Sequence, residues 1–79
     1  MRRTMTEIEK AKRVAELLKQ VKEENPDLSA EELRVQEEMI CLAVEHPNAS
    51  KAKIRRLFRR LRSDEGLSEA AIKAAAKRL

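Results

Sequence analysis

Only three short segments of the 79-residue chain contain proline or the single glycine, and they divide the chain into four stretches. The segments are residues 25–27 (Asn-Pro-Asp), 46–48 (His-Pro-Asn) and 63–66 (Ser-Asp-Glu-Gly). Proline disfavours the α conformation in the residue before it, and glycine readily takes the left-handed conformation that ends a helix. The chain has one aromatic residue and one glycine, which is poor material for strands and hairpins. We therefore expect an all-α fold, a compact domain of four helices.

Capping residues and apolar spacing predict where these helices begin and end. The expected helices cover residues 6–24, 30–45, 49–62 and 68–79, all in a single domain that spans residues 1–79. Thr4 with Glu7, or Thr6 with Glu9, forms a capping-box pattern before the first helix, and Ser-Ala-Glu-Glu from residue 29 forms a clearer one. Spacings of three and four predict the core faces of the last two helices, which comprise Ile54, Leu57, Phe58, Leu61, Ile72, Ala75, Ala76 and Leu79.

The second expected helix ends in an apolar run, residues 39–44, that is apolar on every side. We expect this run to be the most buried part of the protein, with Cys41 as a small buried residue. A single cysteine excludes an internal disulfide, and Cys41 and His46 are not spaced to share a helical face. We expect no metal site, no cofactor and no catalytic residues, and the chain is not expected to be an enzyme.

Charge is divided unevenly along the chain. Residues 1–46 carry 8 basic and 11 acidic residues, a net charge of −3, whereas residues 47–79 carry 10 basic and 3 acidic residues, a net charge of +7. Seven basic and no acidic residues occur from position 51 to position 62. Such an asymmetry indicates that the C-terminal part meets a polyanion and that the N-terminal part supports it.

From residue 39 onward the sequence has a characteristic order of helices and turns. An apolar helix is followed by His-Pro and a small polar cap at residues 46–50, then by a basic helix, a Gly turn and a short helix that begins Leu-Ser-Glu-Ala-Ala-Ile-Lys at residue 67. Residues 39–79 resemble the bacterial tri-helical helix-turn-helix domains. The resemblance implies that helix 68–79 is a recognition helix. The turn at residues 61–66 is looser than the family pattern, and since the sequence ends at Leu79 we expect no β-wing.

This interpretation assigns the C-terminal residues to double-stranded DNA. A recognition helix reads bases in the major groove, and cations on the preceding helix contact phosphates. The expected base contacts are Ser68, Glu69, Ala70, Lys73, Ala74 and Lys77. The expected phosphate contacts are Ser50, Lys51, Lys53, Arg56, Arg60 and Arg78.

The basic residues of helix 49–62 fall into two rows, and the sequence does not decide which row faces phosphate. The first row is Lys53, Arg56 and Arg60, and the second row is Lys51, Arg55, Arg59 and Arg62.

Two other functions remain open at this stage. The capping boxes and near absence of aromatic residues also suit a protein-interaction domain or a computationally designed helical scaffold, including a designed DNA binder. Residues 51–62 also form a basic amphipathic helix of the kind that binds membrane surfaces, although a domain this small needs the apolar face for its core.

No apolar run spans a bilayer and no secretory signal is visible, so we expect an intracellular protein. With one copy of the motif and no evident dimerisation helix, we expect a monomer.

Overall fold

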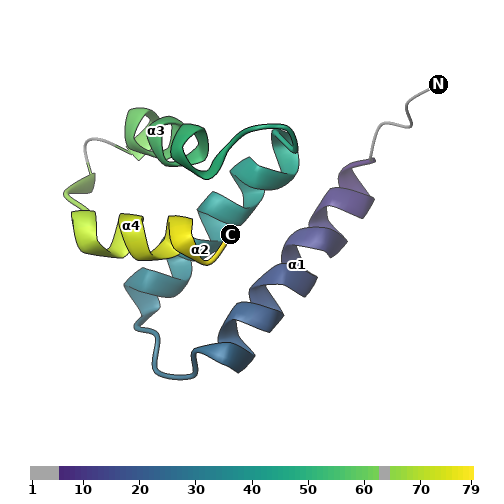
Figure 1. The fold of residues 1–79 in the computed structure, drawn as a ribbon. Helices are drawn as coiled ribbons and strands as arrows, with labels where there is room; N and C mark the ends of the chain where they lie inside the picture. The colour runs from purple at the N-terminus through teal and green to yellow at the C-terminus, as the bar shows by residue number, and fades with distance from the viewer. Residues whose placement is uncertain (1–5, 63–64) are drawn as a thin grey trace.

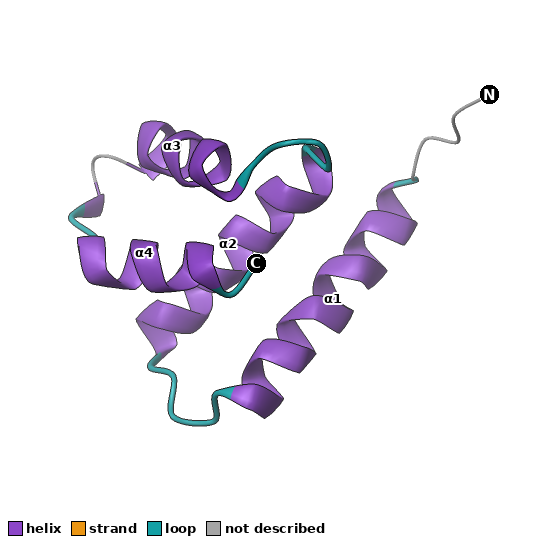
Figure 2. Cartoon of the chain, viewed as in Figure 1, coloured by secondary structure: helices purple, strands orange, loops and turns teal. Residues whose placement is uncertain are grey.

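The computed structural model describes residues 6–62 and 65–79, and these residues form helices and turns without strands. The helices are α1 (Glu7–Glu24), α2 (Ala30–Glu45), α3 (Lys51–Arg62) and α4 (Glu69–Lys77). Figures 1 and 2 show α1 and α2 as an antiparallel pair, with α3 and α4 gathered on the other side of α2. The all-α, four-helix prediction is confirmed.

Side chains at the helix ends explain most of these limits. The Thr6 hydroxyl accepts a hydrogen bond from the Glu9 amide at 3.1 Å, whereas Thr4, the other expected cap, lies outside the described residues. The Ser29 hydroxyl accepts from the Glu32 amide and also donates to the Glu32 carboxylate, both at 3.1 Å. These bonds satisfy amides of the first turn that have no partner inside the helix.

The last two helices are shorter than the sequence predicted. Helix α3 begins at Lys51 rather than residue 49, because the Ser50 hydroxyl caps it by accepting from the Lys53 amide at 3.2 Å. Helix α4 covers Glu69–Lys77 rather than 68–79, with Ser68 and Arg78 as its caps. Gly66, in the turn between them, has a φ of +62°, the left-handed conformation expected of glycine at this break.

Helix α2 packs against each of the other three helices in the described chain, and α3 also packs against α4. One buried cluster holds α2, α3 and α4 together; its members are Val35, Met39, Ile54, Phe58, Ile72, Ala75 and Ala76. Phe58 and Ile54 are each only 1% exposed, so the apolar face of α3 is used inside the protein. The core therefore holds both the basic helix α3 and the short helix α4 against α2.

The prediction that residues 39–44 form the most buried segment is correct only for its first two residues. Met39 and Ile40 are buried, whereas Leu42, Ala43 and Val44 are half-buried and Cys41 is exposed. The expected buried Cys41 is wrong because α1 and α3 cover α2 from different sides and leave Cys41 between them. Leu61, which lines a cavity with Cys41, is 64% exposed, so its expected place in the core is also wrong.

Helix α1 is only partly covered by the rest of the protein. Val21 is its one buried residue among those described, and Ile8 is 70% exposed. The apolar stripe of α1 lies against α2 along one edge and faces solvent along the other. No helix in the described part of the chain is long and apolar enough to span a bilayer.

Candidate nucleic-acid interface

The solvent-facing side of α4 carries the residues expected to contact bases. Ser68, Glu69, Ala70, Lys73 and Lys77 are exposed, and Ala74 is half-buried. The opposite side of α4 is buried through Ile72, Ala75 and Ala76. Alanines separate the lysines on the outer side, so the helix backbone lies close to the surface there. The Ser68 side chain makes no capping hydrogen bond, which leaves its hydroxyl available to another partner.

Glu69 is engaged within the protein. Its carboxylate accepts a hydrogen bond from the Arg59 guanidinium and forms an ion pair with it, joining α4 to α3. Glu69 also lies in the first turn of α4, where a negative charge is favoured by the helix dipole. These two interactions give Glu69 a structural role beside any contact with a base.

The structure separates the two rows of cations on α3. Members of the second row reach neighbouring helices: Lys51 Nζ donates to the Lys77 carbonyl oxygen at 3.4 Å, and Arg59 pairs with Glu69. Arg55, of the same row, is half-buried. Lys51 and Arg59 therefore border α4 and extend its outer surface with positive charge.

The first row lies apart from these contacts. Lys53, Arg56 and Arg60 are exposed, and none of them forms an ion pair with a described residue. At 100° per residue, Lys53 and Arg60 project to the side of α3 away from Lys51, and Arg56 lies near the crest opposite Ile54. The fold makes no use of these three charges among the residues described.

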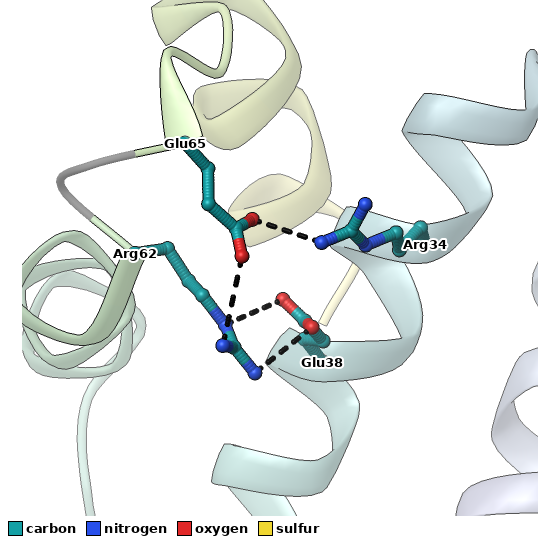
Figure 3. A network of polar contacts seen from close by, with 4 residues as sticks. All are labelled: Arg34, Glu38, Arg62 and Glu65. Carbon is teal, nitrogen blue, oxygen red and sulfur yellow. Dashed lines mark hydrogen bonds and ion pairs between the residues drawn. The ribbon is translucent and has the colours of Figure 1, made fainter.

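Arg62 ends the second row and ties α3 to α2 (Figure 3). Its Nη2 lies 3.0 Å from Glu38 Oε1 and its Nε donates to Glu38 Oε2 at 3.1 Å. Its Nη1 lies 3.7 Å from Glu65, which in turn accepts a hydrogen bond from Arg34 at 3.0 Å. This network joins α2, the end of α3 and the turn before α4, so it helps to fix the angle between the last two helices.

Two residues expected to contact phosphates, Ser50 and Arg78, have side chains that are engaged within the protein. The Ser50 hydroxyl is already used as the cap of α3, although the residue is exposed. Arg78 is half-buried and lines a cavity of about 250 Å³ with Leu17 and Val21 of α1. Its Nη1 is buried and has no hydrogen-bond partner among residues 6–62 and 65–79. The structure therefore does not bring Arg78 together with the cations of α3.

One polar link between α2 and α4 is not predicted by the sequence pattern. Gln36 is fully buried, and its Nε2 donates to the Ala75 carbonyl oxygen at 3.2 Å. A buried amide left without this partner would cost roughly 1–3 kcal/mol. The signal was present, because Gln36 lies next to Val35 and one turn before Ile40 on the buried face of α2.

The described residues contain no group of three or more His, Cys, Asp and Glu side chains placed to hold a metal ion. His46 is exposed and caps the C-terminus of α2, where its amide donates to the Leu42 carbonyl oxygen at 2.9 Å.

Comparison with known proteins returned no matching family model, no matching curated protein and no matching solved structure.

The Arg62 network supplies a first prediction. Arg62→Ala removes the contacts to Glu38 and Glu65, so it should lower the free energy of unfolding by up to about 1 kcal/mol, the upper range for partly exposed ion pairs. Arg60→Ala removes the same kind of side chain where no ion pair is found among the described residues, and should leave stability nearly unchanged. Urea denaturation followed by circular dichroism measures both. Equal losses in the two variants would contradict a structural role for this network.

Proposed function

We propose that the protein binds double-stranded DNA, with α4 in the major groove and cations of α3 on the phosphates. The observation that carries the proposal is the shared surface of α3 and α4. A short helix with an outer face of alanines and lysines lies directly beside a helix that has seven basic residues and no acidic one. An α-helix fits the major groove of B-form DNA. Cations on the neighbouring helix neutralise phosphates, and the counterions released in this way contribute binding affinity.

Lys73 is the residue proposed to read a base. It is exposed on α4, where it is flanked by Ala70 and Ala74 on the same outer side. A lysine ammonium donates to O6 and N7 of guanine, and small alanine side chains fit against thymine methyl groups. Ser68 and Lys77, at the two ends of α4, complete the outer face and lie where the groove edges and their phosphates would pass.

The contacts within the protein support the second row as the nearer source of phosphate contacts. Lys51 and Arg59 border α4, so a duplex lying along α4 meets them before it meets Lys53 or Arg60. Arg56, near the crest of α3, is within reach of the same backbone. The remaining charges of the first row would then act mainly through the long-range field, which attracts DNA without a defined contact.

Burial of the apolar face of α3 favours DNA over a membrane surface. Insertion of a basic amphipathic helix into lipid needs an exposed apolar face. Ile54 and Phe58, at the centre of that face in α3, are both 1% exposed in the folded protein, and only Leu61 at its end is largely exposed.

A second prediction concerns base reading. Lys73→Ala should cost about 1–3 kcal/mol at one base position of the preferred site and relax the preference there. Selection from a randomised duplex library, followed by fluorescence anisotropy with the selected site and its single-base variants, measures the change. Lys19→Ala on α1 is the matched control, since Lys19 is exposed and remote in sequence from the interface. A Lys73→Ala profile identical to that of Lys19→Ala would exclude α4 as the reading helix.

A third prediction separates the two rows on α3. Lys51 and Lys53 are exposed lysines in the same turn, but only Lys51 reaches α4. Lys51→Ala should weaken binding to all duplexes and reduce the slope of log affinity against log salt by about 0.9, the value for one phosphate contact. Lys53→Ala should change that slope much less. Anisotropy titrations over a series of salt concentrations give both slopes, and the reverse order would assign phosphate contact to the first row.

A further inference from the structure

A groove runs along α1 and α2, and nothing in the described chain covers it. The part beside the start of α1 and the end of α2 has a volume of about 450 Å³ and an apolar floor of Ala11, Val14, Ala15, Leu18, Cys41 and Val44. A second part of about 360 Å³ continues past Leu18 and Glu37 to the other end of the pair. All lining residues of both parts belong to α1 or α2, and together these parts are termed the α1–α2 groove.

The fold of one chain covers the apolar floor of this groove only in part. Ala11, Ala15 and Cys41 are exposed, and Val14 and Leu18 are half-buried. Helix α1 depends on such contacts, because helices of this length gain most of their stability from packing of the apolar face. Further burial of this apolar floor by a neighbouring helix would be favourable.

The charges on the two walls of the groove indicate the partner. The α1 wall carries two cations and one anion, namely Lys10, Lys22 and Glu7. On the α2 wall Glu38 and Arg34 are already paired with Arg62 and Glu65, which leaves Glu37 and Glu45 as its net negative charge. Within one chain the walls already attract each other, since Lys10 lies 3.2 Å from Glu45. A second copy, turned about a two-fold axis that runs along the groove, places each cationic wall over an anionic wall. The surface is therefore complementary to itself, as a two-fold interface requires.

The size of the groove fits a reversible association. With a rise of 1.5 Å per residue, helices of 18 and 16 residues give a face about 25 Å long and about 20 Å wide. Such a face offers roughly 500 Å² per copy, or about 1,000 Å² in total, which is the lower limit for a specific interface. The alanines at positions 11 and 15 leave room for close approach of a neighbouring helix.

We propose that the α1–α2 groove is the interface of a homodimer, in which α1 of each copy packs antiparallel to α2 of the other. The two helix pairs then form a four-helix bundle with the apolar floor of both grooves at its centre. This proposal replaces the expectation of a monomer, which rested on the sequence showing no dimerisation helix. It shares no residue with the α3–α4 surface, so its failure and that of the proposed DNA binding are distinguishable.

The first test is sedimentation velocity of the full chain from about 1 μM to about 1 mM, the range in which an interface of this size associates. The mass should rise from that of one 9.1 kDa chain to twice that value. Ala15→Glu should abolish the rise, because it places a negative charge against the partner's acidic α2 wall. Ala15→Lys adds similar bulk with the opposite charge and should retain more association than Ala15→Glu. Ala52→Glu, the same substitution at an exposed alanine outside the groove, should associate like the original chain.

A mass that stays at one chain at the highest concentration would overturn the proposal, as would equal association of Ala15→Glu and Ala52→Glu. Ala15 is exposed and Glu is a good helix former, so Ala15→Glu is expected to fold, and circular dichroism checks this.

Labelling of Cys41 by a soluble disulfide reagent gives a second test that needs no variant. Partial burial, with Glu37, Glu38 and Glu45 nearby, raises the pKa of the Cys41 thiol, so the reaction is followed at a fixed alkaline pH. The thiol is exposed in a single chain but covered in the proposed dimer. The labelling rate constant should therefore fall several-fold over the concentration range in which the mass doubles. A rate constant independent of protein concentration would overturn the proposal.

Discussion

The burial of Phe58 and Ile54 against α2 is the interaction on which the rest of the structure depends. Seven residues from three helices form the central cluster, and they include the only aromatic side chain of the chain. Because Ile54 and Phe58 of α3 are buried in this cluster, the basic residues of α3 lie at its sides or on its solvent-facing crest. The same cluster anchors α4 through Ile72 and two alanines, which turns its alanine- and lysine-rich side outward. The cationic surface is thus a consequence of how a small core is filled.

The helices were predictable because local chemistry sets their limits. Pro26, Pro47 and Gly66 interrupt the chain, Thr6 caps the first helix, and Ser29 and Ser50 cap the helices that follow the two proline breaks. These effects act within one helical turn, so a sequence displays them directly. The outer face of α4 was predictable for a similar reason, since Ile72, Ala75 and Ala76 have the helical spacing of a buried stripe and define the opposite side.

What the sequence did not reveal depends on contacts between distant residues. The pairing of Arg59 with Glu69 and the bond from Lys51 to the Lys77 carbonyl oxygen show which row of α3 borders α4, and helical spacing alone treats both rows alike. Cys41 has the sequence surroundings of a core residue and is nevertheless exposed, because the number of helices around α2 is too small to cover all its sides. Arg78 is a cation at the end of α4, where the sequence predicts a phosphate contact, but its side chain lines a cavity beside α1.

The most direct test of the account is to map duplex binding onto the chain by amide chemical shifts. Isotope-labelled protein is titrated with a short DNA duplex at low ionic strength and again at high ionic strength. Shift changes should concentrate in α3 and α4, including Lys51, Arg59 and Lys73, and added salt should reverse them. Unchanged spectra at low ionic strength, or changes confined to α1, would contradict the claim that the surface shared by α3 and α4 binds DNA.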